Sequence, residues 1–500
     1  MSFHKLFNPT HPTLPLLLYL ALCLGCLTPH LSDNGDNVSY IYLSQSLLNG
    51  QGYINTFYPG DPVETQYPPL LPVLLIPILA FWGQNYLLLK CITIAFGALG
   101  LFVMHRLLCH YTTPSQAWVS TLLTAVNASY LMYATDVLTE VLYVFLSACA
   151  LFSIHRLYLK ETNRDLVLSA FLLALTFYAR TVGVSLIVAV CGVFFLKRRF
   201  KLALKLGVLA ALMILPWFLR SLSVENSYYY QLTEQNAVES PPKTFLYLER
   251  MAHNLPRYAG KVFIDLIGGS HIANLPPSQP IKILSSILLF CLFCLGWIKS
   301  MWQKFTFLEA YMVTYLGIFS IWPYHDARFL VPILPFIFLY IQKGVTALPF
   351  LNTSGAKTSA PNISAAILFF GCLLASLVLI YNNQTQFYTP ETQNFQQACF
   401  WLKDNSPPNA LVLSRNPRMA ANWAHRKTWW YTTGNVLPQT TDRGIPISPT
   451  HILVSHYDIA GVTLADEFEK IMAKTPDQFK LVYKTAPPQV SVYAIQSPGP

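Results

Sequence analysis

Carboxylates that could do acid–base chemistry follow the first long apolar stretch of this 500-residue chain. Asp36 lies in the run SDNGDNVSY, and a carboxylate there can take the proton from an attacking hydroxyl or amine. Asp33 competes for the same role, and Tyr40 follows Asp36 by about one helical turn. Asp36 could also cap a helix that begins at Asn37, and the two roles are compatible.

Arginines at the ends of later apolar stretches form a second group of candidates, namely Arg180, Arg220 and Arg328. Three acids are predicted to lie at the same membrane boundary as these arginines, namely Asp136, Glu140 and Asp326. Charged groups at a membrane boundary are costly unless partnered, and arginine binds phosphate bidentately. The mixed set therefore favours chemistry on a phosphate-bearing substrate. Structural ion pairs and helix caps are the alternative, including a favourable dipole interaction for Glu140 at a helix start.

The sequence shows no cluster of ligands that demands a metal, and use of a divalent cation is left open. His325 and Asp326 could form a metal pair, but two ligands are weak evidence and a loop turn is favoured. The chain has ten cysteines, most of them in or beside apolar stretches. Its two C-x-x-C pairs are interpreted as packing residues because they have no histidine or cysteine partners.

The composition indicates that the solvent of this chain is largely lipid. It is 53% hydrophobic and 11% charged, with mean hydropathy +0.41. Soluble domains are about 25% charged. The net charge of +10 does not indicate nucleic acid, because the basic residues lie mostly in short turns between apolar stretches. The first apolar stretch is interpreted as a retained helix rather than a cleaved signal peptide.

About eleven transmembrane spans are predicted, since a span needs about 20 apolar residues. They lie near 13–29, 85–104, 116–134, 138–154, 165–179, 181–196, 203–219, 281–299, 306–322, 329–346 and 362–382. With this count, the basic turns all fall on one side, which the positive-inside rule assigns to the cytoplasm. The N-terminus is then inside, and Asp36 and the C-terminus are outside.

Two outer segments and an outer domain complete the predicted organisation. The segment 30–84 has an amphipathic helix at 38–48, and a proline-rich stretch at 68–83 that is too short to span and lies at the surface. The second outer segment is 221–280 and includes SYYYQ at 227–231. A transmembrane domain, 1–382, is followed by a small α/β domain, 383–500. The latter has strands at 410–414, 451–457, 479–485 and 490–495, and helices from Pro390 and at 465–474.

The motifs, in this order, resemble those of the polytopic GT-C glycosyltransferases. Within them the chain is similar to bacterial relatives of protein O-mannosyltransferases and lipid A aminoarabinose transferases. The matching runs are DNVSY (36–40), LLNGQGY (47–53), YPPLLPVLL (67–75), TDVLTEVLYVF (135–145), FYARTVGVSLIV (177–188), LPWFLRSL (215–222) and ARFLVPILP (327–335). The aminoarabinose transferases have a lysine where this chain reads Gln66-Tyr67-Pro68, and the mannosyltransferases have a glutamate where it has Asn37.

The resemblance implies transfer of a sugar from a polyprenyl-phosphate donor to an acceptor at the extracytoplasmic face, with inversion. It assigns the role of general base to Asp36, aided by Glu140. It assigns binding of the donor phosphate to Arg328, Arg180 and Arg220. The acceptor would be a glycolipid, polymer or protein of the cell envelope. The implied location is a bacterial inner membrane. A transporter or flippase for the same lipid is the competing class, and an inactive scaffold subunit is a third.

Overall fold

A computed structural model gives the structure of the chain. It describes residues 8–222, 243–272, 279–348, 359–431, 437–442, 444–455, 468, 472 and 476–496. They form two compact units, which we name the helical unit and the sheet unit. The helical unit comprises Met1–Thr28, Thr65–Leu71 and Leu87–Gln384, and the sheet unit comprises Pro29–Glu64, Pro72–Tyr86 and Thr385–Pro500. The first outer segment thus belongs largely to the same unit as the C-terminal residues.

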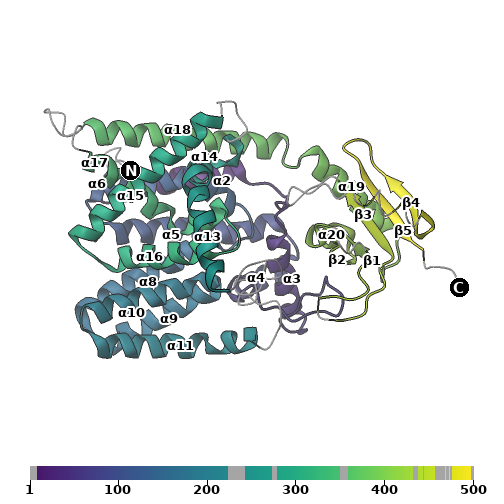
Figure 1. Ribbon diagram of the computed structural model, residues 1–500, viewed down its shortest axis with the longest axis horizontal. Coiled ribbons are helices and arrows are strands. Elements are labelled where there is room, and N and C mark those ends of the chain that lie inside the picture. The colour runs from purple at the N-terminus through teal and green to yellow at the C-terminus, as the bar shows by residue number, and fades with distance from the viewer. Residues whose placement is uncertain are drawn as a thin grey trace. The chain divides into compact units, whose positions relative to one another are not determined.

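Helices make up the helical unit (Figure 1). They are α2 (Thr13–Cys26), α5 (Tyr86–Leu108), α6 (Pro114–Ala125), α7 (Ala128–Ala134), α8 (Glu140–Lys160), α9 (Asn163–Ala179), α10 (Val184–Leu196), α11 (Phe200–Leu222), α13 (Lys243–Arg257), α14 (Phe263–Ile272), α15 (Gln279–Gln303), α16 (Phe307–Ile321), α17 (Leu334–Ala347) and α18 (Ser359–Thr385). Short 3₁₀ turns precede α10 and α17, namely η1 (Thr181–Gly183) and η3 (Ala327–Ile333). A π-helical turn, η2 (Tyr258–Val262), joins α13 to α14.

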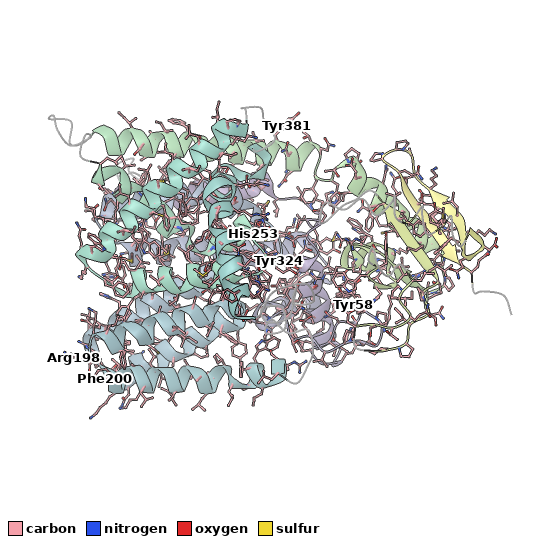
Figure 2. All side chains as sticks on the ribbon, in the orientation of Figure 1. Tyr58, Arg198, Phe200, His253, Tyr324 and Tyr381 are labelled. Atoms are coloured by element: carbon pink, nitrogen blue, oxygen red, sulfur yellow. The ribbon has the colours of Figure 1, made fainter. Side chains whose placement is uncertain are left out.

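Six helical stretches among the described residues are long and apolar enough to cross a membrane. They are Tyr86–Leu108, Glu140–Lys160, Phe200–Leu222, Pro280–Gln303, Ala327–Ala347 and Ile363–Asn405. The predicted polytopic helical membrane protein with a small C-terminal sheet is confirmed. Each of the eleven predicted spans coincides with helix, but their number and the orientation of the chain stay predictions. Figure 2 shows Arg198, in the basic turn before α11, at one end of the helical unit and Tyr324 toward the other.

One predicted span, 116–134, is broken into α6 and α7 at Asn127. The side chain of Asn127 is fully buried, and its Oδ1 accepts a hydrogen bond from Tyr130 N at 3.0 Å, as an N-cap does. Its Nδ2 donates to the Leu266 carbonyl of α14 at 3.0 Å. The same amide therefore ends one helix, starts the next and fixes α14 against α7.

Helices also form in the two predicted outer segments. The proline-rich stretch forms α4 (Leu70–Trp82), whose 13 residues are about 20 Å long, shorter than the roughly 30 Å hydrocarbon core. The predicted surface helix at 38–48 forms α3 (Asp36–Leu48). In the segment 221–280, the structure describes α13, η2 and α14 between the end of α11 and the start of α15. Residues 223–242, which include SYYYQ, and residues 273–278 lie outside the described residues.

Two glycines allow α15 and α17 to approach each other closely. A Cβ on Gly296 would lie 1.9 Å from the Tyr340 carbonyl oxygen, and one on Gly344 would lie 2.0 Å from the Leu292 carbonyl oxygen. Small residues at a helix crossing let backbones pack closely inside a membrane, where packing rather than the hydrophobic effect drives association.

Gly296→Ala is therefore expected to destabilise the protein by about 1–3 kcal/mol, because overpacking forces these backbones apart. Gly317→Ala, in α16, is the matched control, since a Cβ there meets nothing within 4 Å. That control is expected to gain roughly 0.5–1 kcal/mol from better helix propensity. Thermal unfolding of both variants in detergent checks this, and equal melting temperatures would contradict it.

The sheet unit contains α19 (Pro390–Asn405), α20 (Pro417–Ala424) and a five-stranded sheet of order β2-β1-β3-β5-β4. Its strands are β1 (Leu411–Leu413), β2 (Lys427–Trp429), β3 (His451–Ser455), β4 (Phe479–Lys484) and β5 (Val490–Ile495). β1 pairs in parallel with β2 and β3, and β5 pairs antiparallel to β3 and β4. The four predicted strands and the helix from Pro390 are present. The predicted helix at 465–474 lies outside the described residues apart from Phe468 and Met472, both of which are helical.

The core of the sheet unit includes aromatic residues from the first outer segment. Phe57 and Tyr58 pack with Leu413, Trp429 and Ile452 in one buried cluster. The Thr428 amide of β2 donates to the Phe57 carbonyl at 2.9 Å, which covers the edge of the sheet. The sheet therefore depends on a segment that lies more than 300 residues earlier in the chain.

Candidate active site

Glu140 lies at the centre of a buried ion cluster in the helical unit. It is the first residue of α8, and its side chain is fully buried. Its Oε1 accepts hydrogen bonds from Arg180 Nη1, at 2.5 Å, and from Arg328 Nε. Arg180 Nη1 also donates to Thr139 Oγ1 at 3.2 Å. Three of the predicted site residues are thus brought together.

Local structure explains why these three residues meet. Glu140 begins a helix, where the dipole stabilises its negative charge. Arg180 is the extended residue that ends α9, and Arg328 is in the first turn of η3. Two arginines share this one carboxylate, and all three residues lie at the ends of helices. Because Glu140 is buried between two guanidiniums, the geometry favours a positioning role over direct proton transfer to a substrate.

Two other predicted residues of the helical unit, Arg220 and Asp136, lie on α11 and in the bend before α8. Arg220 is in the last turn of α11. Among the described residues, it is not one of the arginines that pair with Glu140. Asp136 is buried, and its Oδ1 accepts a hydrogen bond from Val137 N at 2.8 Å. Lys90, which the sequence did not single out, is buried in α5 and donates to the Thr28 carbonyl at 3.1 Å. It interacts electrostatically with Asp136.

Asp36 makes an ion pair with Arg418 inside the sheet unit. Asp36 Oδ1 accepts a hydrogen bond from Arg418 Nη1 at 2.6 Å, and the two side chains are 17% and 19% exposed. Asp36 is the first residue of α3, so the helix begins one residue earlier than expected, and Gly35 is its N-cap. The carboxylate thus pairs with an arginine instead of capping the helix.

The turn before Asp36 forms hydrogen bonds with the start of α20 and with α19. Asn416 Nδ2 donates to the Asp33 carbonyl at 3.2 Å, and the Asp33 carboxylate accepts from Thr392 Oγ1 at 3.3 Å. Gly35 has φ +85°, and a Cβ there would lie 3.3 Å from Arg418 Cδ. Glycine therefore satisfies both the left-handed conformation and the close approach of the arginine.

Several polar residues near or on the same elements as the Asp36–Arg418 pair are buried. Tyr58 is buried, which raises its pKa, and the neighbouring Arg418 opposes that shift. Asn55 Nδ2 donates to the buried Glu64 carboxylate at 2.5 Å. Tyr40, on α3, is also buried. Tyr58 thus lies within electrostatic range of Asp36, Arg418 and Glu64.

Arg418 is the main site candidate that the sequence reading missed. It lies in the first turn of α20, whose N-cap is Asn416 and whose first residue is Pro417. Asn-Pro is a recognisable helix-start signal, so the helix could have been found. The pairing of Arg418 with a residue almost 400 positions earlier has no local signal.

His325 and Asp326 lie in the loop before η3. Asp326 is the N-cap of η3, and its Oδ1 accepts from Arg328 N at 2.8 Å. His325 Nε2 lies 2.7 Å from Arg257 Nη1. The favoured turn interpretation is thus consistent with a capping role for Asp326. Among the described residues, no three His, Cys, Asp or Glu side chains lie close enough together to hold a metal ion.

Comparison with solved structures identifies the architecture. ArnT from Cupriavidus metallidurans bound to undecaprenyl phosphate matches with a TM-score of 0.60 and 13% identity, over 96% of this chain and 97% of that chain. The archaeal oligosaccharyltransferase AglB from Archaeoglobus fulgidus, in complex with an inhibitory peptide and a dolichol-phosphate, matches with a TM-score of 0.57 and 12% identity, over 99% of this chain and 75% of that chain. The chain has the fold of the GT-C glycosyltransferases.

This GT-C fold accounts for both units, since the match to ArnT covers nearly the whole of each chain. A structure of the Archaeoglobus fulgidus enzyme tethered with an acceptor peptide gives a TM-score of 0.59 at 13% identity, over 97% of this chain and 74% of that chain. No protein-family model and no curated protein sequence matches. The likeness therefore lies in the fold, at identities where residue roles must be argued from this chain.

Proposed function

We propose that this chain transfers a sugar from a polyprenyl-phosphate donor to an acceptor at the extracytoplasmic face of the membrane. The observation that carries the proposal is the Glu140–Arg180–Arg328 cluster, in which two arginines share one carboxylate within a GT-C fold. Arginines bind phosphate through several hydrogen bonds at once. Two of the structural neighbours are bound to undecaprenyl phosphate and to dolichol-phosphate, which are ligands of that chemistry.

The proposed reaction is a direct displacement with inversion at the sugar. The acceptor oxygen or nitrogen forms a bond to the anomeric carbon as the bond from that carbon to the phosphate oxygen breaks. The electron pair leaves with the lipid phosphate, whose growing charge Arg180 and Arg328 stabilise. Asp36 takes the proton of the acceptor. Glu140 holds the two arginines in place, and a divalent cation, if the reaction uses one, would assist the leaving phosphate.

A flippase for the same lipid is the second candidate function. Transporters place charges near the bilayer midplane on interrupted helices of repeated halves. In this chain Glu140 begins a helix, Arg180 ends one and Arg328 lies in the turn before α17. In the predicted topology these three positions are the outer ends of spans, and charges at that boundary favour an enzyme over a transporter.

The test is donor turnover by the purified chain in detergent. A panel of radiolabelled polyprenyl-phosphate sugars is added with and without a membrane extract as the source of acceptor. We expect label to leave one of the donors only when the extract is present, and NMR of the product to report an inverted anomeric configuration. Tight donor binding without turnover in any extract would contradict the proposal and favour the flippase.

Arg328→Gln is expected to weaken binding of the donor phosphate by at least about tenfold, because a charge-assisted hydrogen bond is worth roughly 1.5–3 kcal/mol. Arg198→Gln is the matched control, since Arg198 lies in the basic turn between α10 and α11. Binding of undecaprenyl phosphate, measured by calorimetry, checks both variants. Equal affinities in the two variants would remove Arg328 from the phosphate site.

A further inference from the structure

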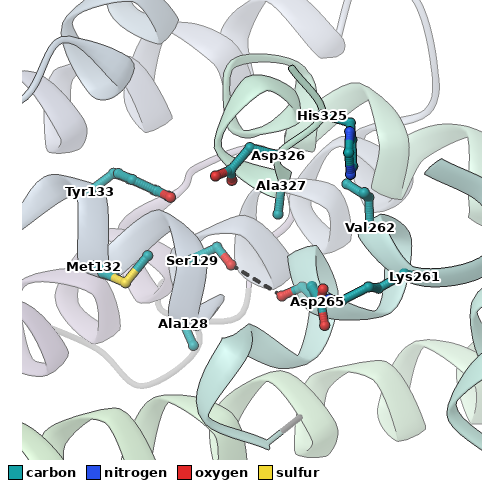
Figure 3. A pocket seen from close by; sticks show the side chains of 10 residues that line it. All are labelled: Ala128, Ser129, Met132, Tyr133, Lys261, Val262, Asp265, His325, Asp326 and Ala327. Atoms are coloured by element: carbon teal, nitrogen blue, oxygen red, sulfur yellow. Dashed lines mark hydrogen bonds between the residues drawn. The ribbon is translucent and has the colours of Figure 1, made fainter. Parts of the chain in front are cut away.

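Three segments that are distant in the sequence line a cavity of about 330 Å³ in the helical unit (Figure 3). Helix α7 contributes Ser129 and Tyr133. The π turn and α14 contribute Lys261 and Asp265, and the loop before η3 contributes His325 and Asp326. The polar wall therefore comes from residues other than Glu140, Arg180 and Arg328.

The backbone around this cavity is irregular on two sides. Asn127 makes α7 a short helix and binds α14 through its side-chain amide. Pro256 lies near the end of α13, and the π turn that carries Lys261 and Val262 follows it. Proline disrupts the α-helical hydrogen-bond pattern, and single π turns are frequent at functional sites.

The cavity adjoins Arg328. Asp326, on its wall, accepts a hydrogen bond from the Arg328 amide, and the ring of Tyr133 lies 5.9 Å from the Arg328 guanidinium carbon. Figure 3 shows Asp326 and Tyr133 on the same side of the cavity, with Lys261 and Asp265 facing them. A group attached to a phosphate on Arg328 would therefore lie next to this cavity.

The lining is suited to a hydroxyl-rich ring. Carboxylates accept hydrogen bonds from hydroxyl groups, and Lys261 and Tyr133 carry donors. Burial raises the pKa of Asp265, and Lys261 opposes that shift. Burial and the Arg257 guanidinium behind it lower the pKa of His325, which favours the neutral ring. A ligand carboxylate would face both Asp265 and Asp326, which disfavours it.

Resting on the proposed function, we propose that this cavity takes the sugar ring of the donor, as a single monosaccharide without a carboxylate. The volume lies at the lower end of the range for ligand pockets, roughly 300–1,000 Å³, so one ring fits better than an oligosaccharide. Ser129 Oγ donates to the Asp265 carbonyl at 3.5 Å, which joins the two walls that would bind the ring.

Binding measurements with the purified full chain test this inference without requiring turnover. The probes are undecaprenyl phosphate alone and the same lipid carrying a hexose, a hexosamine or a hexuronic acid. We expect the hexose or hexosamine to raise affinity over the bare lipid phosphate, and the hexuronic acid to add none. Asp265→Asn is expected to lower the gain in affinity that the sugar provides by about tenfold, which is the effect of one hydrogen bond to a charged group. Its affinity for the bare lipid phosphate should be unchanged.

Glu249→Leu is the control, because Glu249 is an exposed acid on α13 and is not part of the cavity wall. A second variant, Ala128→Leu, fills the cavity and should also remove the gain. Equal gain in all variants, or a hexuronic acid that binds as tightly as the hexose, would overturn the inference. The native chain could transfer sugar while Asp265→Asn shows the native KM for every donor. The assignment of the cavity to the sugar would then be wrong, and the enzyme proposal would stand. If the sugar adds affinity as expected but no donor turns over, the enzyme proposal fails alone.

Discussion

Asp36→Asn is expected to lower sugar transfer by about 10²–10⁴-fold, the usual contribution of general base catalysis. An amide has nearly the same shape as the carboxylate but cannot take the proton of the acceptor. Donor affinity should change little, because the phosphate is assigned to arginines of the other unit. The expected result is therefore a fall in kcat with nearly constant KM, measured with the sugar donor that the native chain turns over.

The ion pair with Arg418 makes this variant informative about structure as well. Asp36 holds Arg418 at 2.6 Å, with both side chains mostly buried. Arg418→Lys keeps the charge but loses the planar fork of donors, so it should lower activity less than Asp36→Asn does. If the pair were purely structural, both variants would lower the melting temperature, and transfer by the folded protein would stay near the native rate.

Two further acids serve as controls for Asp36. Asp61→Asn removes a carboxylate whose pair with Lys427, at 2.7 Å, is about half exposed on both sides. Exposed pairs contribute roughly 0–1 kcal/mol, so this variant should transfer sugar at nearly the native rate. Asp33→Asn tests the competing carboxylate, which accepts a hydrogen bond from Thr392. A large loss at Asp33 with native activity at Asp36 would reassign the base.

The sequence predicted the helices well because each signal for them is local. Apolar length identifies α5 and α15, and the Thr389-Pro390 signal locates the start of α19. The pattern of charges at span ends also singled out Glu140, Arg180 and Arg328, which the structure brings together. These residues interrupt apolar runs, and such interruptions are conspicuous in a membrane protein.

Other features have no local signal and could not be predicted. Arg418 is one basic residue in an ordinary polar stretch, and only the folded sheet unit pairs it with Asp36. Strand β2 has three residues, Lys-Thr-Trp, which form neither an apolar run nor an alternating pattern. The break at Asn127 depends on α14, whose carbonyl the Asn127 amide binds. Each depends on partners that are distant in sequence.

Glu140→Gln is expected to destabilise the protein by about 3–5 kcal/mol, the cost of removing one partner from a buried ion pair. The glutamine would leave two arginines side by side with no negative charge from Glu140, although the side chain keeps its shape. Thermal unfolding in detergent measures the effect. Binding of undecaprenyl phosphate should weaken as well, because the arginines lose the group that orients them.

The other end of the same helix provides the matched control. Glu161 ends α8 and pairs with Arg199 at 2.7 Å, but its side chain is 54% exposed. Glu161→Gln should therefore cost less than about 1 kcal/mol and leave phosphate binding unchanged. If Glu140→Gln instead unfolds like this control and binds the lipid phosphate more tightly, Glu140 competes with the phosphate for Arg180 and Arg328 and does not position them. The two results assign opposite roles to one carboxylate, so this pair of variants decides how the cluster works.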